Sequence, residues 1–151
     1  MKFLIALFFL ASAASHAQSK KPMTAHGTFD VKVIPQAPDD AAGGPFGRLF
    51  LDKKFYGPLD ATSKGQMLAA RTAVEGSAGY VAMEIVSGTL DGRKGSFIMQ
   101  HSGTMTKGTQ TLTITIVPDS GTDELVGIAG TMKIIIADGK HSYELEYTIG
   151  N

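Results

Sequence analysis

Six side chains that could take part in acid–base or binding chemistry lie in stretches that otherwise alternate between polar and apolar residues. They are Glu84, Arg93, His101, His141, Tyr143 and Tyr147. Together they would supply an acid or base, a fixed cation and several hydrogen-bond donors. A few such groups surrounded by apolar side chains are typical of a small-molecule site. That chemistry requires elements that turn these side chains towards one interior.

The last alternating stretch, residues 141–149, gives the clearest direction. His141, Tyr143, Leu145 and Tyr147 occupy alternate positions and therefore share one face of a strand. Because the opposite positions are Ser, Glu and Thr, the aromatic face is expected to point inward. This places one histidine and two tyrosines in the interior.

A second stretch follows residue 92, where Arg93, Phe97, Met99 and His101 share a face. The apolar pair within it, Phe97 and Met99, predicts that this face also points inward. Glu84 is less clear. It shares a face with Tyr80 and Ala82, while the opposite face is also apolar, so its direction stays open.

Three interpretations of these residues remain. They could form a ligand site, in which a buried Glu84 or Arg93 must find a charged or hydrogen-bonding partner. They could instead form a satisfied polar network that fills a small barrel. Two histidines and a glutamate could bind a transition metal, but they come from separate strands without the helical His-Glu spacing. We therefore predict neither a metal nor a cofactor.

The elements that would position these residues are strands. The chain has 18 glycines, six prolines and no tryptophan, with many Thr, Val and Ile residues, which indicates short strands separated by turns. Alternation with a period of two predicts eight of them, at residues 24–34, 48–56, 61–71, 79–90, 93–104, 109–117, 130–137 and 141–149.

The connections predict antiparallel pairing. Asp91-Gly92, Lys107-Gly108 and Asp138-Gly139 are hairpin dipeptides. Residues 35–47 are rich in proline and glycine and predict a long surface loop. Residues 122–125 predict one short helical turn. Eight such strands could form a sandwich or a barrel, and closure is favoured because few charged residues are available to guard a free edge.

The N-terminus has the anatomy of a secretory signal peptide. Lys2 precedes an apolar run at residues 3–10 and a stretch of small residues that ends at Ala17. We expect cleavage after Ala17, export to the periplasm or the medium, and one barrel domain over residues 18–151. Beyond the signal, no apolar stretch approaches the length of about 20 residues needed for a membrane-spanning helix.

Composition excludes several classes of protein. Fourteen basic residues balance 14 acidic ones, so the positive footprint of a nucleic-acid-binding protein is missing. The chain has no cysteine, which rules out disulfides and zinc sites built on thiolates. Removing 17 of the 151 residues leaves 134, a length typical of one domain.

A family resemblance rests on three longer segments. They are residues 80–103, with Gly88-Thr89-Leu90-Asp91-Gly92-Arg93; residues 118–130, with Pro118-Asp119-Ser120-Gly121; and residues 141–147. The chain resembles the bacterial domain of unknown function 3224 family, whose structures are similar to the allene oxide cyclase barrel. The resemblance implies an all-β fold, a single eight-stranded antiparallel barrel, and no established activity. Proteins that share this barrel bind apolar or phenolic substrates in its interior, but fold alone does not fix function.

Three functional hypotheses follow. The first is a binding barrel that holds a small apolar or phenolic ligand in its lumen, and the second is an isomerase or cyclase with Glu84, His101 or His141 as acid and base. The third is an interaction module that forms a homo-oligomer through an outer face containing Val81, Met83 and Ile85.

Overall fold

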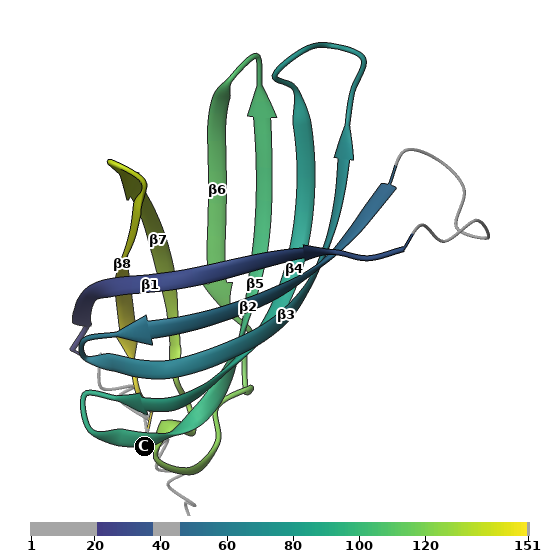
Figure 1. Cartoon of the computed structure of the whole chain (residues 1–151). Coiled ribbons are helices and arrows are strands. Elements are labelled where there is room, and N and C mark those ends of the chain that lie inside the picture. The colour runs from purple at the N-terminus through teal and green to yellow at the C-terminus, as the bar shows by residue number, and fades with distance from the viewer. Residues whose placement is uncertain (1–20, 38–45, 151) are drawn as a thin grey trace, which may run out of the picture.

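The structure, a computed structural model, describes residues 21–37 and 46–150. Eight antiparallel strands form one closed barrel and follow one another around it in chain order (Figure 1). They are β1 (Met23–Pro35), β2 (Phe46–Tyr56), β3 (Leu59–Arg71), β4 (Ala78–Leu90), β5 (Arg93–Thr106), β6 (Thr109–Ile116), β7 (Ala129–Ala137) and β8 (Lys140–Thr148). The all-β class, the strand number and closure are thus confirmed.

The three hairpin dipeptides form the tightest turns of the barrel. Asp91 and Gly92 both adopt positive φ, 48° and 78°, between the paired residues Leu90 and Arg93. Two consecutive positive φ values belong to the turn that matches the twist of antiparallel strands. Lys107-Gly108 and Asp138-Gly139 have the same signs and join β5 to β6 and β7 to β8.

One end of the barrel is closed by the segment between β6 and β7. It contains the 3-10 helix η1 (Asp123–Leu125), which is the predicted helical turn. Leu125 and Ile128 are buried there against the core. Thr122 holds the segment to β5, since its amide donates to the carbonyl of Ser96 and its hydroxyl accepts from the amide of Ser96.

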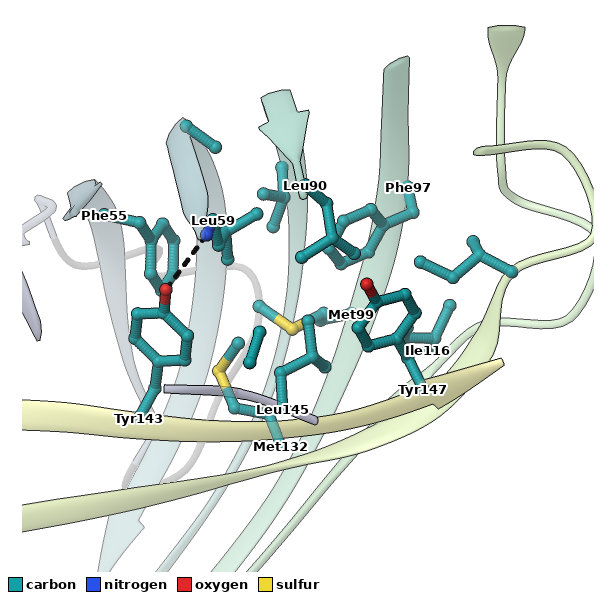
Figure 2. Packing of buried hydrophobic residues seen from close by; sticks show 14 of the residues in the cluster. Phe55, Leu59, Leu90, Phe97, Met99, Ile116, Met132, Tyr143, Leu145 and Tyr147 are labelled. Carbon is teal, nitrogen blue, oxygen red and sulfur yellow. Dashed lines mark hydrogen bonds between the residues drawn. The ribbon is translucent and has the colours of Figure 1, made fainter. Parts of the chain in front are cut away.

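The interior next to this end is a packed apolar core (Figure 2). Phe55, Leu59, Phe97, Leu145 and Tyr147 are among its most deeply buried members, each no more than 1% exposed. Because alternate residues of a strand point to opposite sides, every strand contributes one face to this core. This half of the barrel is filled by side chains.

The seam between β6 and β7 is the weakest in the barrel. Only Thr115 and Thr131 pair across it, whereas the other seven neighbouring pairs share six or more paired residues. Beyond this point the two strands diverge towards the open end (Figure 1). The barrel is therefore closed at one end and split at the other.

Two sequence expectations fall wholly or partly outside the described residues. The signal peptide, residues 1–17, lies outside them entirely. Of the loop expected at residues 35–47, Pro35 ends β1 and Phe46 begins β2, and residues 38–45 are not described. Among the described residues, no helix is long and apolar enough to cross a membrane.

Candidate functional site

Four buried polar side chains form a cluster in the middle of the barrel. They come from four consecutive strands: Lys53 from β2, Ser63 from β3, Glu84 from β4 and His101 from β5. Their exposed fractions lie between 1% and 5%. Each occupies a position on the inward face of its strand, between the apolar core and the open end. We call these four residues the polar cluster.

Glu84 is the centre of this cluster. Lys53 Nζ donates to its Oε1 at 2.8 Å, Ser63 Oγ donates to its Oε2 at 2.8 Å, and His101 Nε2 lies 2.9 Å from Oε1. Since an ionised carboxylate only accepts hydrogen bonds, Nε2 of His101 must carry the proton and donate it. All three partners therefore favour the charged form of Glu84.

The electrostatics of Glu84 follow from these contacts. Burial alone would raise its pKa, because it penalises the charged form. The hydrogen bond from His101, the charges of Lys53 and His101, and the hydrogen bond from Lys53 outweigh burial and hold the pKa at about 2. Glu84 is thus an anion at neutral pH, and it forms a buried ion pair with Lys53.

Aromatic rings complete the surroundings of Lys53. Its Nζ lies 5.5 Å from the ring centre of Phe29 and 5.9 Å from that of Phe55. Both distances are within the range of a cation–π interaction. The ammonium group is therefore held by a carboxylate and two ring faces.

A glycine makes room for Glu84. Gly65 is its cross-strand partner on β3, and a Cβ atom at position 65 would lie 2.6 Å from the Cβ of Glu84 and 2.7 Å from the carbonyl oxygen of Met83. Real Cβ atoms do not approach other atoms so closely. The close approach of β3 to β4 at this level thus requires the glycine.

An open cavity of about 910 Å³ lies on the mouth side of the polar cluster. Its apolar wall includes Leu49, Met67, Tyr80, Met105 and Leu112. On β2, Leu49 is two inward positions from Lys53; on β5, Met105 is likewise two inward positions from His101. The polar cluster therefore lies directly below this mouth cavity.

Tyr80 is the largest side chain in the cavity wall. Its ring lies against Gly103 on β5, where a Cβ atom would overlap the ring. Burial, together with the negative charge of Glu84, raises the pKa of Tyr80. The phenol thus stays protonated at neutral pH and remains a hydrogen-bond donor at the mouth cavity.

The six residues singled out from the sequence do not form one site. Glu84 and His101 come together in the polar cluster, and the open question of the direction of Glu84 is resolved inward. Tyr143 and Tyr147 also point inward, but they belong to the packed core. The Tyr143 hydroxyl accepts from the amide of Leu59 at 3.1 Å (Figure 2).

Within the described part of the chain, Tyr147, Arg93 and His141 form no hydrogen bond or ion pair with the polar cluster. The Tyr147 hydroxyl donates to Asp91, and burial together with that carboxylate raises its pKa to about 12. Arg93, expected in the lumen, is exposed at the first residue of β5, because that end of the strand emerges from the barrel at the turn. The half-buried His141 packs its ring 5.1 Å from that of Phe29.

Two members of the cluster were missed in the sequence. Lys53 stands in the run Asp52-Lys53-Lys54, which is typical of a solvated surface. Its place in the alternation of the strand could have revealed it, because Leu51, Lys53 and Phe55 share one face. Ser63 likewise shares a face with Leu59 and Ala61 on β3.

The donor set does not resemble a metal centre. Across residues 21–37 and 46–150, no group of three or more His, Cys, Asp or Glu side chains lies close enough to hold a metal ion. In the same ranges every buried side-chain nitrogen or oxygen has a hydrogen-bond partner. The arrangement supplies an oriented imidazole, a paired carboxylate and an apolar cavity above them.

Comparisons with known proteins agree with this fold. Residues 25–147 match the model of a family described as "Protein of unknown function (DUF3224)". A crystal structure of a DUF3224 protein of unknown function from Shewanella oneidensis MR-1 is 48% identical in sequence, with a TM-score of 0.81. The match covers 87% of this chain and 99% of that one. No curated protein matches the chain.

Proposed function

Because the chain belongs to the DUF3224 family, whose description assigns no function, we propose a function from the barrel interior: binding of a small apolar or phenolic ligand in the mouth cavity. The observation that carries this proposal is the contrast between the two halves of the barrel. One half is filled by a packed core, and the other leaves about 910 Å³ of apolar-walled space above a buried polar cluster.

The size and composition of the cavity support the proposal. Ligand cavities commonly measure about 300 to 1,000 Å³ and combine apolar walls with a few polar groups. Two methionines, Met67 and Met105, lie in this wall. Methionine adapts its shape to different apolar partners. Tyr80 adds a phenol to the lining of the cavity, and its hydroxyl is a polar group that a phenolic ligand could contact.

Ligand screening tests this proposal. Thermal shift and native mass spectrometry are measured with dodecanol and with naphthol, which represent the aliphatic and phenolic classes. Binding is expected to raise the melting temperature and to give a one-to-one complex. Failure of both probes and of a wider apolar and phenolic library would contradict the proposal.

A pair of tryptophan variants locates the binding site. Ala69→Trp places a large ring in the cavity wall and is expected to abolish the shift. The matched control, Ala129→Trp, changes an exposed alanine at the opposite end of the barrel and is expected to retain it. Equal binding by both variants would place the ligand elsewhere.

The contact between Glu84 and His101 favours a second candidate, an isomerase-type enzyme. An imidazole oriented by a carboxylate is a common general acid or base. For a carbonyl ligand found in the screen, incubation in D₂O would reveal enzyme-dependent deuterium uptake next to the carbonyl. His101→Gln is expected to abolish that uptake without preventing ligand binding. Uptake that survives in His101→Gln would contradict this candidate.

We further propose that the chain is exported and cleaved after Ala17. The support is the order of Lys2, an apolar run and small residues at the N-terminus. The absence of cysteine is compatible with an oxidising compartment. Expression in a bacterium followed by fractionation should give a protein outside the cytoplasm whose first residue is Gln18. A full-length chain confined to the cytoplasm would contradict export.

A further inference from the structure

The split between β6 and β7 leaves two strand edges without a partner in the described part of the chain. Residues 109–114 of β6 pair only with β5, and residues 132–137 of β7 pair only with β8. Such an edge presents a row of backbone N–H and C=O groups that can pair with another strand. The chemical class of partner that these groups select is an extended polypeptide.

The edge of β7 has a single charged residue, Lys133, as protection against such pairing. Natural edges are commonly guarded by charge, proline or a bulge. Here Ile134, Ile135 and Ile136 follow one another, and Ile135 and Ile136 are 50% and 61% exposed. The charged residue before them, Lys133, is engaged with Glu144 and Glu146 on the neighbouring strand β8. The stretch from Ile134 to Ala137 is thus apolar on both faces, while the side chain of Lys133 beside it remains 67% exposed.

We propose that β7 is a dimerisation strand, which pairs antiparallel with β7 of a second copy of this chain around a two-fold axis at Ile135. In that register Ile135 lies opposite its own copy, Ile134 lies opposite Ile136, and Lys133 lies opposite Ala137. No like charges meet, and the apolar residues face one another. The edge is therefore complementary to itself, as a two-fold interface requires.

The self-complementarity favours a second copy over another partner. The β6 edge is less suited, because an equivalent pairing around Leu112 would place Gln110 opposite Ile114. The β8–β7 hairpins of two copies would join through their β7 strands into one continuous sheet. Because the shared edge is only a few residues long, the dimer is expected to dissociate on dilution.

A competing surface allows a matched control. The outer face of the barrel carries the exposed apolar residues Phe50, Leu68, Val81 and Met83 around a groove of about 530 Å³. Val81 lies on β4, which is paired on both sides and offers no free backbone edge. A β-branched residue of similar exposure can thus be changed at either surface.

Sedimentation velocity over a dilution series tests the interface. The wild-type chain is expected to show a monomer–dimer equilibrium. Ile135→Lys places like charges opposite each other and is expected to weaken dimerisation at least tenfold, while Val81→Lys leaves it unchanged. Mixing Ile135→Lys with Ile135→Glu should restore a dimer. A wild-type monomer at the highest soluble concentration, or a dimer lost in Val81→Lys alone, would overturn the proposal.

A crosslink gives a second test, which traps the dimer and does not depend on weakening it. Since the chain has no cysteine, one introduced cysteine has no other partner. Directly opposed residues in antiparallel strands lie within disulfide reach. Mild oxidation should convert Ile135→Cys, but not Val81→Cys, into a covalent dimer. Crosslinking of Val81→Cys alone, or of neither variant, would overturn the β7 interface.

Discussion

His101 reaches Glu84 diagonally across β4 and β5 rather than from the opposite position. The residue directly opposite His101 is Ala82, and the residue opposite Glu84 is Met99. The small side chain of Ala82 leaves space for the imidazole to turn towards the carboxylate, where Nε2 lies 2.9 Å from Oε1. This diagonal contact links the two strands below the mouth cavity.

Removing the carboxylate should destabilise the barrel strongly. Glu84→Leu leaves Lys53 as a buried charge without its ion-pair partner, a change that typically costs about 3–5 kcal/mol. Urea unfolding measures the free energy of unfolding. The matched control is Lys64→Met, which removes the exposed pair with Asp52 and should cost less than about 1 kcal/mol. Equal losses of the free energy of unfolding in the two variants would show that the buried pair stabilises the barrel no more than the exposed pair does.

Removing both charges together should restore much of that loss. In the double variant Lys53→Met with Glu84→Leu, neither charge remains buried, and apolar replacement of a buried pair is often neutral. The free energy of unfolding is expected to lie closer to wild type than that of Glu84→Leu alone. A double variant that loses as much free energy of unfolding as Lys53→Met and Glu84→Leu lose together would contradict coupling between Lys53 and Glu84.

Stability should fall at acid pH because of Glu84. Its folded pKa of about 2 lies below its ordinary value of 4.5, so the charged form stabilises the fold above about pH 4.5. This contribution, about 3 kcal/mol, is lost as the pH falls from about 4.5 to about 2. Urea unfolding at several pH values should show a steeper acid loss for wild type than for Glu84→Gln. Parallel curves would contradict the lowered pKa.

Gly65 should tolerate no side chain. Gly65→Ala brings a Cβ atom into overlap with Glu84 and with the backbone of Met83, so β3 and β4 must separate. Overpacking of this kind typically costs about 1–3 kcal/mol. Gly47→Ala, where the nearest atom lies 4.0 Å away, is the control and should change the melting temperature little. A smaller loss for Gly65→Ala than for Gly47→Ala would contradict the close packing.

The two core tyrosines should matter for stability and not for ligand binding. Tyr143→Phe leaves the buried amide of Leu59 without its acceptor, which typically costs about 1–3 kcal/mol. Tyr147→Phe removes the hydrogen bond to Asp91. Both variants should melt at lower temperature and still bind dodecanol or naphthol with wild-type affinity. Loss of binding at wild-type stability would move the site into the core.

Most of the fold could be predicted because its signals are local. Strand alternation and the three turn dipeptides reflect the backbone of each hairpin, and the inward faces of β5 and β8 follow from parity. Closure was predictable because few charged residues are available to guard a free edge. The separation of β6 and β7 at the open end was not predictable from the sequence, because it depends on the shape of the whole barrel.

The site was less predictable because it combines residues from four strands. Glu84 lies on a strand with apolar residues on both faces, because Val81, Met83 and Ile85 are exposed on the outer face although their side chains are apolar. The alternation of this strand therefore does not show which face points inward. Lys53 looks like Lys54 in sequence, and only its shared face with Leu51 and Phe55 separates them. Arg93 has the expected parity but lies too close to the turn to enter the lumen.

Binding in the mouth cavity is tested most directly by one fluorescent residue. Since the chain has no tryptophan, Leu112→Trp places a single reporter in the cavity wall. Titration with dodecanol or naphthol should shift its emission in a saturable manner, while a reporter at the exposed Val126, at the closed end, should not respond. An unchanged Leu112→Trp spectrum with both probes, or an equal response at Val126→Trp, would contradict ligand binding in the mouth cavity.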